Sequence, residues 1–160
     1  MITIKSHSGI YTLEVKQFVG IPIAEAWNFF SAPGNLSKIT PEQMGFIITS
    51  GAAGKMYTGQ IITYKVSPFP GFTTNWVTEI THVSDGRFFV DEQRFGPYSM
   101  WHHEHHFEVQ GKGVLMTDRV TYKLPFGFLG RIAHFIFVKK QLLQIFEYRE
   151  KFLEQAYKQS

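Results

Sequence analysis

Residues 88–107, FFVDEQRFGPYSMWHHEHHF, carry the pattern that most constrains how this chain folds. The stretch predicts two β-strands that meet at Gly96-Pro97, because its aromatic residues favour strands and this dipeptide interrupts them. Successive side chains of a strand point to opposite faces. One predicted face therefore combines aromatic rings with an acid, an amide and two imidazoles, from Phe89, Asp91, Gln93 and Phe95 in the first strand and Trp101, His103, His105 and Phe107 in the second.

Polar groups on an otherwise aromatic face cost several kcal/mol to bury unless they have partners. We therefore expect Asp91, Gln93 and the two imidazoles to pair with one another, with water or with a ligand. The opposite face of the second strand carries His102, Glu104 and His106, which we expect to face solvent. A shift of one residue in register would exchange the two faces.

The remaining strand patterns are joined by short turns, which predicts an antiparallel sheet, because parallel neighbours need a long crossover. Asp85-Gly86 and the segment 110–113 are typical hairpin turns. Glycine and proline also predict a loop at 50–59 and a turn at 67–71. Strand patterns cover residues 10–19, 46–49, 60–66, 72–82 and 114–123, and in the last of these Val114, Met116, Asp118, Val120 and Tyr122 share a face.

Helical patterns follow the first strand and return at the C-terminus. Pro22 suits the first position of a helix that continues to Phe30, and residues 35–39 predict a further short turn. From Phe126 to the end, the period is helical. The apolar residues there form one predicted stripe that we expect to pack on the sheet, made of Phe128, Ile132, Phe135, Ile136, Leu142, Leu143, Phe146, Leu153 and Tyr157.

The composition predicts a single folded domain over residues 1–160. Hydrophobic residues make up 44% of the chain and charged residues 18%, a balance that argues against disorder. The net charge is only +3, and the densest cationic group, Lys139, Lys140, Arg149 and Lys151, suggests a solvated helix face. Nucleic-acid binding would need a basic stripe with stacking aromatics beside it, so no nucleic-acid partner is expected.

The chain contains no cysteine, which excludes disulfides and thiolate metal sites. The N-terminus lacks the apolar core of a secretion signal. The most apolar run, 126–138, is shorter than a bilayer span and contains Arg131 and His134. We therefore expect a cytoplasmic protein without stable membrane insertion, whose protein partners, if any, the sequence does not name.

Four segments resemble one known superfamily in their order along the chain. They are PIAEAWNFFSAPGNLSKITPEQMGF at residues 22–46; the strand with Trp76 and Ile80; the motif Phe89-x-Asp91-x-Gln93-x-x-Gly96-Pro97-Tyr98 followed by Trp101-x-His103-x-His105-x-Phe107; and Asp118 to Tyr122 followed by Pro125-Phe126-Gly127. With them the chain resembles the SRPBCC, or START-like, superfamily, which includes lipid-transfer domains, polyketide cyclases and the birch-pollen allergen. It is most similar to bacterial ligand-binding members labelled cell-division-inhibitor-like or polyketide cyclase-like.

This resemblance implies an α+β helix-grip fold. A curved antiparallel sheet of about seven strands would wrap around a long C-terminal helix, with two short helices after the first strand. A helix about 10 Å across cannot fill the concave side of such a sheet, so large side chains or a ligand must occupy the space. We expect the ligand-binding residues to be Tyr64, Trp76, Phe89, Asp91, Gln93, Trp101, His103, His105, Phe107, Asp118 and Tyr122.

Several functions fit these polar side chains on an aromatic face. It is either purely a structural hydrogen-bond network, or the anchor for a lipid, aromatic or polyketide-like molecule held by a hydrophobic carrier or sensor. As an alternative, His103 or His105, oriented by Asp91 or Asp118, would be the general acid or base of a cyclase or dehydratase-like enzyme. A protein-interaction module, with an exposed apolar patch and no cavity, is a further possibility.

Metal and cofactor binding are not expected. His103-x-His105 places two imidazoles on one strand face, but a catalytic metal usually needs a third protein ligand. Glu108 follows His105 too closely to complete the spacing of a cupin site. The sequence also contains no phosphate-binding glycine loop and no cofactor fingerprint.

Overall fold

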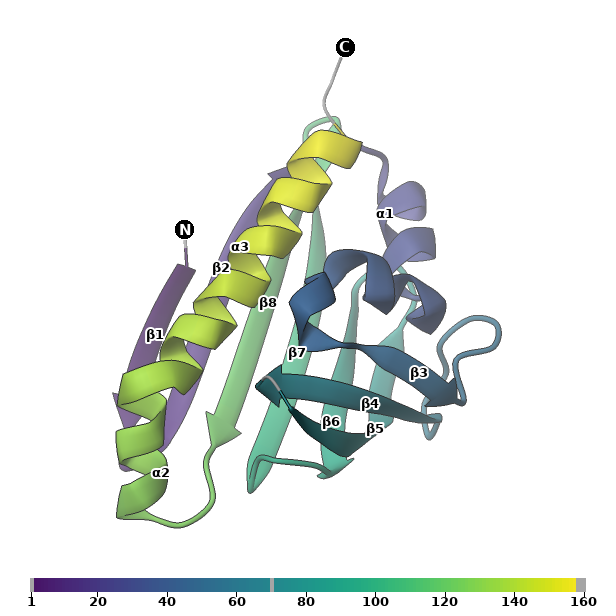
Figure 1. The fold of residues 1–160 in the computed structure, drawn as a ribbon. Coiled ribbons are helices and arrows are strands. Elements are labelled where there is room, and N and C mark those ends of the chain that lie inside the picture. Colours follow the sequence, from purple (N-terminus) through teal and green to yellow (C-terminus); the bar gives the residue numbers. More distant parts are fainter. Residues whose placement is uncertain (1, 70, 158–160) are drawn as a thin grey trace.

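The computed structural model describes residues 2–69 and 71–157, and within them eight strands form one antiparallel sheet (Figure 1). The spatial order is β1-β2-β8-β7-β6-β5-β4-β3, so every chain neighbour except the β2/β3 pair is also a neighbour in the sheet. The strands are β1 (Ile2–His7), β2 (Ile10–Val19), β3 (Ile47–Ser50), β4 (Ile61–Phe69), β5 (Phe72–Ser84), β6 (Phe88–Phe95), β7 (Met100–Gln110) and β8 (Gly113–Lys123).

The helices lie on one face of this sheet. Figure 1 shows the C-terminal helices crossing in front of β2 and β8, while β3, β4 and β5 curl forward on the other side. This is the α+β helix-grip fold that the sequence predicted. The helical elements are α1 (Ile23–Phe30), the 3-10 helices η1 (Pro33–Ile39) and η2 (Glu42–Met44), α2 (Phe128–Ala133), the π-helical turn η3 (His134–Val138) and α3 (Lys139–Ala156). None of the helices in the described ranges is long and apolar enough to cross a membrane.

The strand count differs from the prediction because β1 was missed. This strand pairs with β2 at the sheet edge, and its residues after Ile4 are exposed, so its sequence lacks the apolar alternation of a buried strand. Ser8 and Gly9, both with positive φ, turn the chain between the two strands. The turn predicted at 67–71 is shorter than expected, since β4 extends to Phe69 and β5 begins at Phe72; Pro70 itself lies outside the described residues.

The predicted apolar stripe is wrong over α2 and η3. There Phe128, Ile132, Phe135 and Ile136 are exposed, by 49% to 84%. Apart from Arg131 and His134 the segment is apolar, so periodicity could not select its buried face. The π-helical turn also changes the phase between α2 and α3. The side chains that are buried along these helices lie on a different line, formed by His134, Val138, Leu142, Phe146, Arg149 and Leu153.

The predicted faces of β6 and β7 are correct around Asp91, His103 and His105. His103 and His105 are buried, whereas His102 and His106 lie half-exposed on the other face and pair with Glu92 and Glu104. Phe95 is an exception. A β-bulge, in which Thr78 pairs with Gln93 but Val77 pairs with Phe95, ends the alternation, and the Phe95 ring is 63% exposed.

Candidate functional site

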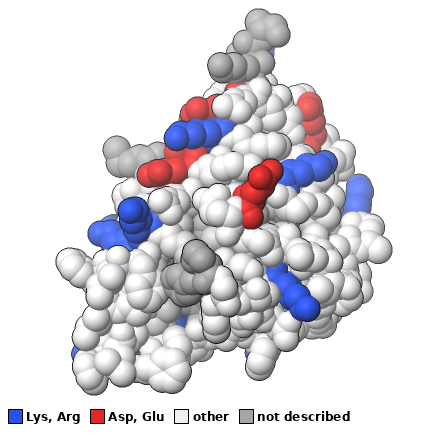
Figure 2. Space-filling model, viewed as in Figure 1, with Lys and Arg blue, Asp and Glu red and all other residues white. Residues whose placement is uncertain are grey.

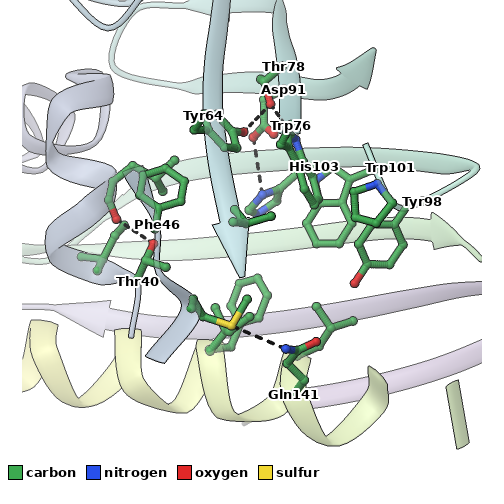
Figure 3. Close-up of a pocket in the computed structure, with 18 of the residues that line it drawn as sticks. Thr40, Phe46, Tyr64, Trp76, Thr78, Asp91, Tyr98, Trp101, His103 and Gln141 are labelled. Carbon is green, nitrogen blue, oxygen red and sulfur yellow. Dashed lines mark hydrogen bonds and ion pairs between the residues drawn. The ribbon is translucent and has the colours of Figure 1, made fainter. Parts of the chain in front are cut away.

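A cavity of about 540 Å³ lies between the concave face of the sheet, the 3-10 helices and the C-terminal helices. Its walls are mostly apolar, with aromatic rings from β4, β5 and β7 and from the β6–β7 turn. Trp76, Tyr98 and Trp101 contact one another, with ring centroids 4.8 to 5.7 Å apart. Figure 3 shows these three rings grouped together. Of the eleven predicted ligand-binding residues, the seven that line the cavity are Tyr64, Trp76, Phe89, Asp91, Trp101, His103 and His105.

The other four predicted residues do not line the cavity. The Gln93 amide donates to the carbonyl of Tyr98 at 2.7 Å and accepts from its N–H at 3.1 Å, so it fastens the β6–β7 turn. Phe107 packs in the core against Trp27 and Phe30 on α1. Tyr122 and Asp118 are buried beneath the cavity wall, and the partners of Asp118 are described below. Alternation identified the inward face correctly but could not tell cavity wall from packed core.

Four residues on three adjacent strands form a closed ring of contacts. Asp91 on β6 stands opposite His103 on β7, and Asp118 on β8 stands opposite His105 on β7. Nε2 of His103 lies 3.0 Å from Asp118 Oδ1, and Nε2 of His105 lies 3.0 Å from Asp91 Oδ2. The second ring nitrogens approach the other carboxylates, with His103 Nδ1 3.5 Å from Asp91 and His105 Nδ1 2.8 Å from Asp118.

Arg149 on α3 completes this group, which we call the polar cluster: Asp91, His103, His105, Asp118 and Arg149. Its Nη1 donates to Asp118 Oδ1 at 3.2 Å, and its guanidinium lies 4.9 Å from the centre of the Phe146 ring. Arg149 is only 6% exposed and lines the cavity. The expectation that it belongs to a solvated helix face is therefore wrong. The sequence signal for the burial of Arg149 was its helical spacing, since it falls three residues after Phe146 and four before Leu153.

The surroundings of the polar cluster shift the pKa values of its two imidazoles in opposite directions. Burial opposes the charged form of His105, but Asp118 and Asp91 outweigh it and raise the pKa of His105. Burial and the neighbouring His105 lower the pKa of His103, despite Asp91 and Asp118. Burial disfavours ionised Asp118, yet the Arg149 charge and the two imidazoles hold its pKa well below the usual range.

This ring limits what the histidines can do chemically. Both nitrogens of His103 and of His105 lie within 3.5 Å of a carboxylate oxygen. A general acid or base must reach the ligand with one of these nitrogens. Proton transfer from His103 Nε2 or His105 Nε2 to a cavity ligand would therefore require a hydrogen bond to a carboxylate to break, whereas His105 Nδ1, although 2.8 Å from Asp118, makes no hydrogen bond to any described residue.

The cluster also offers metal ligands. Asp91, His103 and His105 each provide one ligand atom, and these three atoms lie within 4.8 Å of one another. Two imidazoles and a carboxylate form a donor set that iron or zinc accepts. Arg149, however, already supplies a positive charge next to Asp118, and the neighbouring carboxylates raise the pKa of His105, so a metal ion would compete with protonation of that imidazole. The prediction that no metal binds stays a prediction, which elemental analysis of untagged protein tests.

A second polar group lies on β4 and β5 beside the cluster. The Tyr64 hydroxyl is hydrogen-bonded to Thr78 Oγ1, which also accepts a hydrogen bond from Trp76 Nε1 at 3.0 Å (Figure 3). Burial and the Asp91 charge raise the pKa of Tyr64, so its hydroxyl stays protonated. Thr78 was not among the predicted site residues, although it shares the strand face of Trp76 and lines the cavity.

No family model and no curated protein matches this sequence. Solved structures match it over almost its whole length. Ginseng major latex-like protein 151 from Panax ginseng is 14% identical with a TM-score of 0.67, and the alignment covers 94% of this chain and 99% of that one. Protein CV1439 from Chromobacterium violaceum is 12% identical with a TM-score of 0.69, covering 93% and 99%, respectively. Protein Ms6760 from Mycobacterium smegmatis is 14% identical with a TM-score of 0.66, covering 98% and 99%.

The chain has the helix-grip fold. Identities of this size establish the shared architecture and leave activity to be argued from the site. The site in this helix-grip protein consists of the cavity, the aromatic walls and the polar cluster at one wall.

Proposed function

We propose that this protein binds one small, largely apolar molecule with a polar end inside the cavity, as a carrier or a sensor. Pockets for small molecules typically enclose 300 to 1,000 Å³ and combine apolar walls with a few polar groups, a description that fits this cavity. At the roughly 30 Å³ that one water occupies in the liquid, 540 Å³ suits a ligand of on the order of twenty non-hydrogen atoms. Lipid, aromatic and polyketide-like molecules fall in this class.

The observation that carries the proposal is that Arg149 is a buried cation with one unsatisfied hydrogen-bond donor. Its guanidinium lines the cavity, yet its Nε finds no hydrogen-bond partner among the described residues. An unsatisfied buried donor costs about 1–3 kcal/mol, more for a charged group. Nε has almost no surface open to the cavity, so a small shift of the Arg149 side chain would let a carboxylate, phenol or carbonyl oxygen at the polar end of the ligand accept this hydrogen bond and recover that cost.

The polar cluster would orient the ligand, and the aromatic walls would provide affinity. Drug-sized ligands bind with about 0.3 kcal/mol per non-hydrogen atom, so a ligand of roughly twenty atoms gains about 6 kcal/mol. That corresponds to a dissociation constant on the order of tens of micromolar, with tighter binding for a molecule that fits both walls and cluster. Titrations should therefore start in the micromolar range.

The test uses 8-anilinonaphthalene-1-sulfonate, a fluorescent probe of suitable size with an aromatic body and an anionic end. We expect the wild-type protein to bind it, and both Arg149→Met and the cavity-filling Ile145→Trp to weaken binding at least tenfold. Arg119→Met, which removes a half-exposed cation on β8, is the matched control and should leave binding unchanged. Equal binding by wild type and both cavity variants would overturn the proposal. Mass spectrometry of molecules that co-purify with the protein would identify the natural ligand.

A further inference from the structure

An exposed apolar surface surrounds the start of the C-terminal helices. A helix with apolar residues on most of its sides normally lies inside a protein or in a membrane, but α2 stands at one end of the molecule (Figure 1). Contiguous exposed apolar surface of this kind marks an interaction site. We call these residues the α2 patch, and they are Phe126, Phe128, Leu129, Ile132, Phe135, Ile136 and Phe137, with exposed fractions from 38% to 84%.

The backbone holds part of the α2 patch in an unusual conformation. Phe126 has a φ of 64°, in the left-handed region that bulky residues rarely adopt, and its ring is 81% exposed. A glycine would suit this position better if the side chain had no role outside the fold. Gly130 then allows α2 to pack closely, since a Cβ there would lie 2.2 Å from the carbonyl oxygen of Pro125. The chain thus fixes the direction of an aromatic ring that the fold itself does not bury.

The charge along the segment that carries the α2 patch has one sign. From residue 119 to residue 146 the sequence contains five Lys and Arg residues and no Asp or Glu. Lys123, Arg131, Lys139 and Lys140 of this segment are exposed. Figure 2 shows the lower left of the molecule, where α2 lies, as largely uncharged surface, with every visible Asp and Glu in the upper half of the view.

The α2 patch is continuous with the cavity. Phe126, Leu129 and Phe137 are exposed and also line the cavity wall. Whatever covers the α2 patch therefore lies at the mouth of the cavity. A convex apolar tip framed by cations suits the interfacial zone of a bilayer with anionic lipids, where aromatic and aliphatic side chains enter the headgroup region and Lys and Arg meet lipid phosphates.

We propose that the α2 patch docks this protein on the surface of an anionic lipid bilayer, with the cavity mouth facing the lipid. Docking depends only on the α2 patch and its cations. The consequence that an apolar ligand passes between bilayer and cavity rests on the proposed function.

Vesicle co-sedimentation tests the docking with the whole protein and without any cavity ligand. Wild type should bind vesicles of phosphatidylcholine containing 30% phosphatidylglycerol, and bind pure phosphatidylcholine vesicles at least tenfold more weakly. Phe135→Glu/Ile136→Glu should abolish binding. The control is Val109→Glu, a residue 68% exposed on β7 near the β7–β8 hairpin, which Figure 1 places at the other end of β8 from α2. It should bind like the wild type, and circular dichroism confirms that all variants are folded.

The cations provide a second, independent measurement. Each Lys or Arg near an anionic surface contributes about fivefold in affinity, so Lys139→Gln/Lys140→Gln should bind about 30-fold more weakly. Lys112→Gln, an exposed lysine in the β7–β8 hairpin, is the matched control and should change binding little. Equal binding to both vesicle types, or unchanged binding by Phe135→Glu/Ile136→Glu, would overturn the proposal.

Two further outcomes separate this proposal from others. A dimer in sedimentation velocity that Phe135→Glu/Ile136→Glu dissociates, without vesicle binding by the wild type, would assign the α2 patch to a second copy of the chain. Arg149→Met should dock on vesicles like the wild type, because Arg149 is buried away from the α2 patch. Failure of the cavity proposal therefore leaves docking intact, and failure of docking leaves ligand binding by the cavity intact.

Discussion

Replacing Asp118 by Asn tests whether the polar cluster is a network of charges buried within the sheet. The substitution keeps the shape of the side chain and removes its charge. Asp118 accepts contacts from His103, His105 and Arg149, and it is only 6% exposed. Without its carboxylate, the guanidinium of Arg149 stays buried, with no other carboxylate in contact among the described residues.

The expected loss of stability follows from this arrangement. Removing one partner of a buried ion pair costs about 3–5 kcal/mol, because the remaining charge is left uncompensated. For a chain of this length, 1 kcal/mol corresponds to about 2–4 °C in melting temperature. Asp118→Asn should therefore melt about 6–20 °C below the wild type. Glu14→Gln is the control. Glu14 pairs with Arg119 at 3.0 Å on the same sheet, but both side chains are partly exposed. The loss of unfolding free energy in this variant should therefore stay within about 1 kcal/mol.

Urea unfolding at pH 7 provides the free energies, and a double-mutant cycle isolates the pair. Asp118→Asn/Arg149→Met should recover part of the loss, since it also removes the unpaired guanidinium. The coupling energy between the two sites should exceed about 1 kcal/mol. A loss below about 1 kcal/mol for Asp118→Asn, or strictly additive effects in the double variant, would refute the reasoning that these charges depend on each other.

Three further predictions concern pH and the start of the C-terminal helices. The pKa of His105 is raised in the folded state, so His105 contributes stability that is complete below about pH 6.5 and is lost as the pH rises through the folded-state pKa. The pKa of His103 is lowered in the folded state, so His103 contributes stability that is present above about pH 6.5 and is lost on acidification. Urea midpoints should therefore peak near pH 6.5, and His105→Gln should remove the alkaline decline; an unchanged decline would contradict the assignment. Gly130→Ala should lower the melting temperature rather than gain the about 1 kcal/mol of helix propensity, because its Cβ would collide with Pro125. Phe126→Gly should raise stability by about 1 kcal/mol in urea and weaken vesicle binding; a loss of stability would show that the ring packs on the fold.

Much of the site follows from local rules that the sequence expresses directly. A strand exposes alternate residues to one face, so Asp91 on β6, His103 and His105 on β7, and Asp118 on β8 can be assigned to a common face from periodicity alone. Short turns between these strands require antiparallel neighbours, which brings those faces together. The predicted sheet and the terminal helix therefore needed only periodicity and turn chemistry. The inward direction of the polar side chains also needed the assignment of the aromatic face as the inner face.

Tertiary structure decided the rest, because the deciding contacts join residues that are far apart in sequence. Arg149 joins Asp118 across 31 positions, and only the packing of α3 on the sheet selects which turn of the helix meets the carboxylate. The strand pattern likewise could not separate Trp101, on the cavity wall, from Phe107, in the core. At α2 apolar residues lie on most sides of the helix and Arg131 is the one charge, so the sequence contains little contrast from which a buried side could be deduced. The packing of Gly130 against Pro125 and the π-helical turn bury one line of residues, and they leave the α2 patch exposed.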